Sequence, residues 1–435
     1  MDIDILILIG ALVVFAVLAF KQISVLVLAP AITLVVFALM RMPVLENMMS
    51  AFMPSAANYI GNYFLLFFVG AIFGAVYQFT GAAEAIALAI IRISKGKFAA
   101  PVIMCITGLL TYGGISGFVV FFVVYPIALN MFKKGDISRM LLPAAISSGC
   151  WAWSMTTPGS PSIPNKVAMT SLGTSSVAAF VPSMIAMIIE FALMFAWLEY
   201  RGRALRKKGH GFEDSTLKIQ LTGDELKENE SKDLPSAIVA LIPIAVIVVL
   251  FNVFKLPVET AVFIGVILAV VLMFKKVKTG RGWINVFNKG AQDCCPAILN
   301  TSIVVGFGGA MQSTEAFQSL ISILQGLSIP PMLFVFITVS ICAAACGSAS
   351  GGMGVAFGAL TNVFKGLGIN LEYVHRVGTI AAGAFGTMPH QGALITLLGI
   401  CKLTHKEAYF DVFVTQLVIP TLAFVVFFAL ATVGL

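Results

Sequence analysis

The chain has 435 residues, of which 59% are hydrophobic and 11% charged, whereas an ordinary soluble domain carries roughly 25% charged residues. This composition excludes a soluble enzyme, and it equally excludes disordered, collagen-like and disulfide-scaffold proteins. The formal net charge of +7 comes from lysines and arginines scattered between apolar runs, which is typical of topology signals in a lipid bilayer and indicates no nucleic-acid partner.

In chain order, residues 3–20 predict a retained first helix, because no basic region or small-residue cleavage site precedes Lys21. The positive-inside rule then places the N-terminus outside. Residues 23–40 return outward, and residues 63–78 come back in. The next apolar run, 99–132, is too long for one span of about 20 residues, yet basic residues on both of its sides must be inside. A re-entrant helical hairpin with its tip at residues 111–117 satisfies both conditions.

The chain then crosses outward from residue 141, is expected to unwind at residues 156–165 and returns through residues 177–197. Residues 201–235 follow, with eight basic and seven acidic residues among 35. They predict a cytoplasmic hydrophilic linker between two membrane halves, residues 1–200 and 236–435.

The second half predicts the same elements with the opposite orientation. Residues 234–254 go out, 258–274 come in and a helix over 296–312 goes out. A hairpin over 331–364 enters from the outside, and residues 377–401 cross inward with an interruption at 386–392. The last helix, 412–433, places the C-terminus outside.

The two halves also share residues. Residues 113–117 (GGISG) match residues 347–351 (GSASG) with an offset of 234, and Pro158 pairs with Pro389 further along. The predicted fold is therefore an all-α polytopic membrane protein, built from two inverted repeats with re-entrant hairpins and broken transmembrane helices. This pattern is typical of transporters, because half-helix ends at the midplane expose backbone groups that bind ions.

Two hairpin tips and two interrupted segments supply the candidate substrate-binding residues. Glycine allows a close backbone approach, hydroxyl groups donate hydrogen bonds, and helix N-termini favour carboxylates. Small-residue helix packing is the alternative explanation for each motif taken alone. The candidates are Gly113, Gly114, Ser116, Gly117, Thr156, Thr157, Gly159, Ser160, Asn165, Ser348, Ser350, Gly351, Thr387, His390 and Gln391.

Three titratable residues are candidates for proton coupling. His390 could bind a carboxylate or carry a proton, or could satisfy a carbonyl that Pro389 frees. Glu190 lies within a span but outside the four motifs, and it reads more readily as a protonated or locally paired residue. Asp293 precedes an expected helix start and reads more readily as an N-cap. The seven cysteines show no two-pair CxxC arrangement, so neither a metal, a disulfide nor a cofactor is expected.

The motifs TYGGISGFVVFFVVYPIALNMFKKGDISRMLLPAAISSGCWAWSMTTPGSPSIPN (from Thr111) and CGSASGGMGVAFGAL (from Cys346) resemble the gluconate permease (GntP) family of the ion transporter superfamily. The resemblance implies an inner-membrane importer of gluconate, hydroxybutyrate, glycerate or a related small organic acid, driven by proton symport. The wider superfamily implies a homodimer in which a scaffold carries a moving, elevator-like transport domain.

The leading prediction is therefore a symporter for a small carboxylate, held by helix N-termini and hydroxyl groups, since no arginine lies within the four motifs. A sodium-coupled carboxylate symporter or a cation/proton antiporter is the alternative within transport. An ion channel fits less well because it seldom needs inverted broken-helix repeats. An enzyme is not expected, because no nucleophile, base or metal constellation occurs at these motifs.

Overall fold

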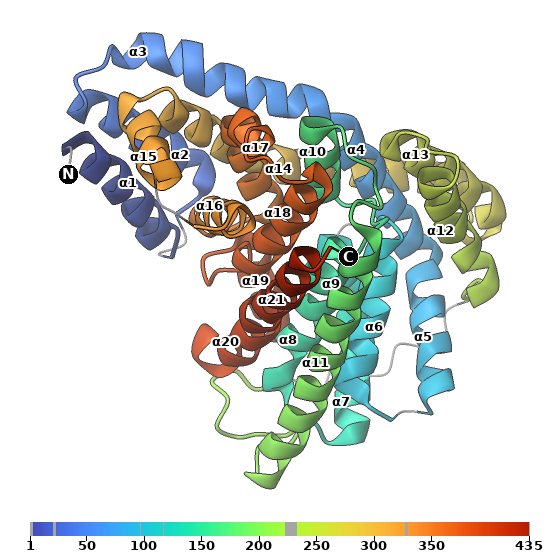
Figure 1. Cartoon of the computed structure of the whole chain (residues 1–435). Coiled ribbons are helices and arrows are strands. Elements are labelled where there is room, and N and C mark those ends of the chain that lie inside the picture. Colours follow the sequence, from blue (N-terminus) through green and yellow to red (C-terminus); the bar gives the residue numbers. More distant parts are fainter. Residues whose placement is uncertain are drawn as a thin grey trace.

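The structure is a computed structural model that describes residues 3–20, 23–95, 97–115, 117–221, 233–326 and 329–434. Every regular element in these ranges is helical (Figure 1). Within them, four helical runs are long and apolar enough to cross a membrane, namely Val44–Thr80, Phe180–Lys207, Gly280–Gln312 and His405–Thr432. Shorter apolar helices accompany these runs. The all-helical expectation is therefore confirmed.

The first half opens with a helical pair and a long helix that continues through a π turn. The elements are α1 (Ile3–Phe20), α2 (Val25–Leu39), α3 (Val44–Asn47), η1 (Met48–Phe52), α4 (Met53–Thr80), α5 (Ala82–Ser94), α6 (Ala99–Tyr112), α7 (Gly117–Gly135), η2 (Arg139–Leu141), α8 (Leu142–Ser147), η3 (Ser148–Ala152), α9 (Trp153–Thr156), α10 (Ile163–Leu172) and α11 (Phe180–Lys207). Gly81 ends α4 with a left-handed φ of 74°, a conformation that favours glycine.

The second half repeats this order of a helical pair, a long helix, a short helix, a hairpin, an interrupted helix and a final long helix. Its elements are α12 (Ala237–Asn252), α13 (Val258–Leu272), η5 (Phe274–Lys276), α14 (Gly280–Gln312), α15 (Glu315–Gly326), α16 (Pro331–Cys346), α17 (Ala349–Lys365), α18 (Leu371–Phe385), α19 (Gly392–Cys401), α20 (His405–Phe413), η6 (Val414–Val418) and α21 (Ile419–Thr432). The Ser348 hydroxyl caps α17 by accepting from Gly351 N, and a Thr404–Glu407 capping box begins α20.

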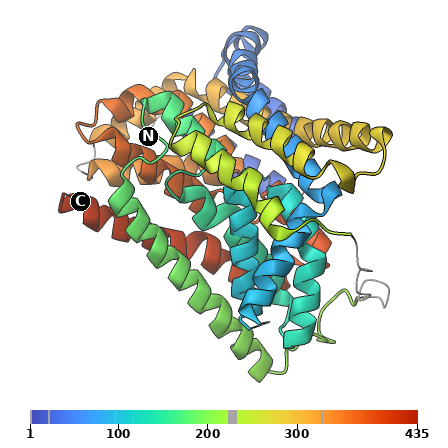
Figure 2. The same ribbon diagram turned by 90° about the vertical axis from the view of Figure 1, so that its right-hand side faces the viewer.

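Helices α1–α5 and α12–α15 form a group that we call the frame. The long helices α4 and α14 pack together along much of their length, while α2 lies on α14 and α13 lies on α4 (Figures 1 and 2). Small residues permit this approach: a Cβ on Gly290 would lie 2.8 Å from Ile72 Cα. Each helical pair therefore packs against the long helix of the other half.

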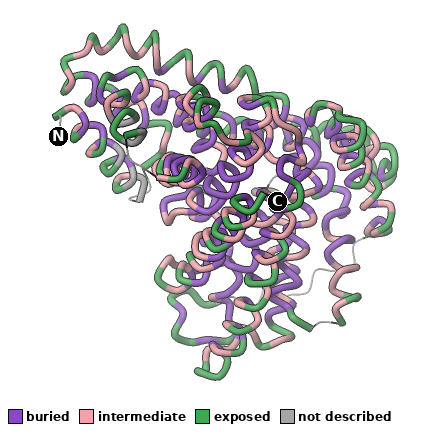
Figure 3. The backbone as a smooth tube through the Cα atoms, viewed as in Figure 1, coloured by how far each residue is buried: buried purple, intermediate pink, exposed green. Residues whose placement is uncertain are grey.

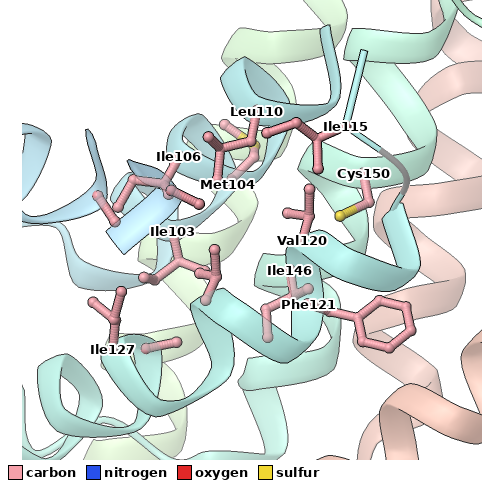
Figure 4. Close-up of a cluster of buried hydrophobic side chains, with 14 of the residues drawn as sticks. Ile103, Met104, Ile106, Leu110, Ile115, Val120, Phe121, Ile127, Ile146 and Cys150 are labelled. Carbon is pink, nitrogen blue, oxygen red and sulfur yellow. The ribbon is translucent and has the colours of Figure 1, made fainter. Parts of the chain in front are cut away.

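Helices α6–α11 and α16–α21 form a second group, which we call the hairpin group. Within the hairpin group, the two halves of the chain are joined by contacts of α10 with α17 and of α11 with α21, and α16 also contacts α18. The interior of this group is largely buried (Figure 3). Hairpin α6–α7 packs on α8 and η3 through the apolar cluster in Figure 4, which includes Ile103, Met104, Ile106, Leu110, Ile115, Val120, Phe121, Ile127, Ile146 and Cys150.

Both expected hairpins are present as helix-turn-helix units. The predicted range 99–132 contains α6 and α7, and the predicted range 331–364 contains α16 and α17. The interruption predicted at residues 386–392 is also found, because α18 ends at Phe385 and α19 begins at Gly392.

Two predictions of local structure are wrong. The first interruption covers only residues 157–162, because Ile163, Pro164 and Asn165 are helical and a proline is tolerated in the first turn of α10. Asp293 is no N-cap, since α14 starts thirteen residues earlier at Gly280 with Thr279 as its cap, and the helix expected over 296–312 is therefore longer. Helix α11 continues to Lys207, into the first residues of the expected linker 201–235, whose local conformation the sequence left open.

Residues 212–219 of the linker fold back onto the hairpin group. Phe212 N donates to Asp136 Oδ1 at 3.1 Å, Arg139 Nη2 donates to Ile219 O at 3.1 Å, and Lys218 N donates to Glu407 Oε1 at 2.7 Å. Residues 212–219 therefore bridge the α7–α8 junction and the start of α20. Residues 222–232 of the linker lie outside the described ranges.

Candidate functional site

The tip of hairpin α6–α7 is wedged between the frame and η3. Gly114 turns the chain with a φ of 92°. A Cβ on Gly113 would lie 2.8 Å from Ile244 Cγ2 of α12, and one on Gly117 would lie 2.8 Å from Trp151 Nε1. Glycine at these positions is therefore required by close packing as well as by the turn. Ser116 lies outside the described residues.

The tip of hairpin α16–α17 contacts the second interruption. Gly347 has a φ of 54°, and a Cβ there would lie 2.7 Å from His390 Cδ2. Ser348 Oγ accepts from Gly351 N at 3.1 Å and lies 3.3 Å from Ser350 Oγ. The predicted residues Ser348, Ser350 and Gly351 thus form one capping turn whose hydroxyl groups lie beside a glycine-rich helix start.

The first interruption, residues 157–162, is held by side chains of α6 and α12 and by the backbone of Ser176. Tyr112 Oη of α6 donates to Pro158 O at 3.1 Å, and Asn252 Nδ2 of α12 donates to Gly159 O at 3.0 Å. Gly159 adopts a φ of 80°, and its N–H donates to Ser176 O at 2.8 Å. The backbone groups freed by the interruption are therefore largely bonded within the protein.

The second interruption, residues 386–391, is held by α20. His405 Nε2 lies 2.7 Å from Pro389 O, and Tyr409 Oη donates to Thr387 O at 3.4 Å. The His390 ring faces Gly347 at the end of α16. Gln391 is 8% exposed, and its Oε1 has no hydrogen-bond partner among the described residues.

A buried polar cluster joins the first interruption to α18. Asn165 of α10 donates from Nδ2 to Met155 O at 2.9 Å and to Ser162 Oγ at 2.8 Å. Its Oδ1 lies 3.0 Å from His375 Nε2 and accepts from Arg376 Nη1 at 3.2 Å. Both polar side-chain atoms of Asn165 thus have hydrogen-bond partners within the protein. This candidate therefore holds neighbouring residues in position.

Arg376 is the centre of this cluster and is 1% exposed. Its Nη1 donates to Thr156 O and Asn165 Oδ1, and its Nη2 donates to Ala178 O at 3.3 Å. The guanidinium therefore satisfies the carbonyl group left free at the end of α9.

Glu190 approaches the same interruption from α11. It is 1% exposed, and its Oε2 accepts from Thr156 Oγ1 at 3.4 Å. Its Oε1 has no hydrogen-bond partner among the described residues. Although the sequence placed Glu190 outside the four motifs, the fold brings its carboxyl group to Thr156. Arg201, three turns along α11, instead forms a bidentate pair with Asp411 at 2.6 and 2.9 Å.

The other titratable candidates and the cysteines lie in different surroundings. Asp293 pairs with Lys289 on the partly exposed surface of α14, away from both interruptions in the chain. The seven cysteines are free, and no group of three or more His, Cys, Asp or Glu side chains among the described residues could hold a metal ion.

The fold brings the four predicted motifs into one packed body. Tyr112 connects the first hairpin to the first interruption, and Gly347 meets His390 between the second hairpin and the second interruption. A Cβ on Gly383 of α18 would lie 3.1 Å from Thr156 Cγ2, which joins the two interrupted helices. Thr157 and Ser160 are buried in the first interruption, as is Thr387 in the second.

Arg376, His375, Tyr112 and Asn252 belong to this body but were missed from the sequence. A signal for Arg376 was available. The predicted topology placed the His375-Arg376 pair at an outer membrane end, where the positive-inside rule disfavours arginine. A basic residue at variance with that rule is a candidate for a buried functional role.

Two helical hairpins facing two interrupted helices, with buried polar groups at the breaks and long apolar helices around them, define a multi-pass membrane transporter. The sequence matches the CitMHS citrate transporter family over residues 5–287. It is 30% identical over 464 aligned positions to the uncharacterized transporter YxjC of Bacillus subtilis (strain 168), with 96% of each chain covered. The chain therefore belongs to the CitMHS citrate transporter family.

The fold is also similar to the crystal structure of the Alcanivorax borkumensis YdaH transporter, whose topology is described as unusual. The TM-score is 0.59 at 13% sequence identity, and the match covers 89% of this chain and 88% of that one. This likeness concerns the fold alone. The gluconate permease family remains a resemblance of motifs.

Proposed function

We propose that this protein is a secondary active symporter that imports a small hydroxycarboxylate together with protons. The observation that carries the proposal is the convergence of both hairpin tips and both interruptions in the hairpin group, with a buried carboxyl group and a buried guanidinium at the first interruption. The substrate class follows from the family name and from the gluconate permease motifs, because citrate, gluconate and hydroxybutyrate all combine carboxylate and hydroxyl groups.

For proton coupling, Glu190 is the strongest of the three candidates. It is buried, it contacts Thr156 in the interrupted helix, and one of its oxygens is unbonded within the described structure. A carboxyl group in such a place can take up a proton when substrate binds and release it on the other side. His390 beside the second hairpin is the second candidate. Asp293 is the weakest, because Lys289 already pairs with it.

For the transport motion, we propose an elevator-like displacement of the hairpin group against the frame, in a homodimer in the inner membrane. The two halves would be inverted repeats, with both termini outside and the linker cytoplasmic. Support comes from the repeated order of elements and from the small number of polar contacts that join the two groups among the described residues. These contacts include the Lys166–Glu259 ion pair at 3.2 Å and the hydrogen bond of Asn252 with Gly159 O.

Uptake into proteoliposomes tests this function. Labelled citrate, gluconate, 3-hydroxybutyrate and glycerate are offered with an inward proton gradient, an inward sodium gradient, both gradients or neither. The proposal predicts saturable accumulation of at least one acid that requires the proton gradient. Accumulation driven by sodium alone would instead support sodium coupling, and non-saturable flux down a gradient would support a channel.

The binding residues are tested in the same assay. Ser350→Ala, and Ser116→Ala at the other tip, should weaken uptake while the folded protein is retained. Ser322→Ala on the exposed surface of α15 is the matched control and should leave uptake unchanged. Normal uptake by both tip variants would contradict the assignment of the hairpin tips to the substrate site.

A further inference from the structure

Arg376 differs from the largely buried Arg201 in its charge balance. Arg201 pairs with the carboxylate of Asp411 at 2.6 Å. Arg139 and Arg376 both lack such a direct pair among the described residues, and carboxylates act on them only from a distance, those of Asp214 and Glu407 on Arg139 and that of Glu372 on Arg376. No carboxylate forms an ion pair with Arg376 among the described residues.

The partners of Arg376 are neutral oxygen atoms. They are two carbonyl groups, of Thr156 and Ala178, the amide of Asn165 and the hydroxyl of Thr379 at 3.5 Å. Glu372 lies one turn earlier on α18, but its Oε2 accepts from Ala179 N at 2.8 Å. Arg376 Nε has no hydrogen-bond partner within the described residues. A buried cation with no carboxylate in direct contact is costly, and an anionic ligand bound against it would reduce that cost.

The geometry around the guanidinium favours an anion further. Asn165, which accepts from Arg376, is in the first turn of α10, whose N-cap residue Ser162 makes no side-chain cap hydrogen bond. The positive end of the α10 dipole and the guanidinium charge therefore lie at the same interruption. Carboxylates bind guanidinium groups through short charge-assisted hydrogen bonds.

We propose that Arg376 supplies the buried positive charge that selects a carboxylate-bearing ligand at the first interruption. The inference rests on the proposed transport function and makes it more specific. The carboxylate would then be recognised by a fixed cation, Arg376, and not by hydroxyl groups and helix ends alone. The Nη atoms of Arg376 are occupied by the carbonyl groups of Thr156 and Ala178 and by the amide oxygen of Asn165, and Nε remains for the ligand.

Ligand binding and competition on purified protein test this role. Thermal shift is measured with citrate, gluconate and 3-hydroxybutyrate and with the neutral amide of each acid. Wild-type protein should be stabilised by an acid and not by its amide. Arg376→Gln should raise the Kd of that acid by about 10- to 100-fold and narrow the acid-to-amide preference, as expected for loss of a charged hydrogen-bond partner. Arg376→Lys, which keeps the charge, should retain most of that preference.

Two variants separate the charge from the structural role of the side chain. Asn165→Asp places a carboxylate against Arg376 and should weaken acid binding while Arg376 itself remains. Arg139→Gln, at a buried arginine outside the four motifs, is the matched control and should leave acid binding unchanged. If Arg376→Gln and Asn165→Asp fold and keep the wild-type preference for acid over amide, the inference is overturned.

The outcome is distinguishable from failure of the transport function. If wild-type protein binds an acid but does not accumulate it, the proposed transport fails while selection by Arg376 is still decided by the variants. If wild-type protein binds no acid, or binds acid and amide equally, Arg376 does not select an anion.

Discussion

The close packing of hairpin α16–α17 makes a glycine substitution informative. A Cβ on Gly352 would lie 2.3 Å from Ala343 Cα and 2.6 Å from its backbone nitrogen. Neither atom can rotate away, since both belong to the backbone of the facing helix. Gly352→Ala must therefore separate α16 from α17 near the tip. Overpacking of this kind costs about 1–3 kcal/mol, and the displaced tip would no longer hold His390 through Gly347.

The matched control is on the same helix. Gly358 has no atom within 4 Å of a Cβ position, so Gly358→Ala adds a methyl group to open space. Because alanine is a better helix former than glycine, this variant should be neutral or stabilised by up to about 1 kcal/mol. The assays are thermal unfolding of purified protein and uptake in proteoliposomes. If Gly352→Ala unfolds at the same temperature as Gly358→Ala and transports normally, the packing at the second tip is not as described.

Three further outcomes are expected. Asp411→Asn removes the negative charge of the carboxylate that pairs with Arg201 in bidentate geometry and that also accepts a hydrogen bond from Trp197 Nε1. This variant should destabilise the protein by about 2–4 kcal/mol, and an unchanged unfolding midpoint would refute this. Glu190→Gln should abolish accumulation driven by a proton gradient but preserve exchange of labelled for unlabelled acid, and preserved accumulation would exclude Glu190 as the coupling residue. The folded part of the linker should loosen in acid. Burial tends to raise the pKa of Asp214, but hydrogen bonds from Thr216 and His210 outweigh burial and lower this pKa. The ionised Asp214 therefore stabilises the folded linker fully above the ordinary carboxyl pKa, and this stabilisation is lost as the pH falls through the lowered pKa. Hydrogen exchange of residues 212–221 should therefore rise only below about pH 4, and Asp214→Asn should remove that pH dependence; exchange that rises at neutral pH would contradict it.

The hairpins could be predicted because their signals are local. An apolar run longer than one span, with basic residues on the same side at both ends and a glycine-serine motif in the middle, has few other solutions in a bilayer. The second interruption could also be predicted from a local signal, because its Gly and Pro residues interrupt an apolar run. The first interruption was predicted too long, because Pro164 is compatible with a first helical turn as well as with a break.

The polar centre could not be predicted in the same way. Asn165 meets His375 and Arg376 across more than 200 residues of chain, and no periodicity encodes such a contact. Glu190 looked remote because its helix carries no motif, yet α11 packs so that its carboxyl group reaches Thr156. The misplaced start of α14 had a simpler cause. Residues 280–295 are too polar to resemble a membrane span, although they form the first part of the same helix, which continues through Asp293 to Gln312.

Proton symport requires that a carboxylate and a proton enter together. Its most direct test is to add the accepted acid outside proteoliposomes with no imposed pH gradient and to record the external pH and the labelled acid at once. Proton symport predicts that the external pH rises in step with saturable acid entry, and that Glu190→Gln abolishes the pH change. Saturable entry without any proton movement, in the presence or absence of sodium, would contradict proton symport.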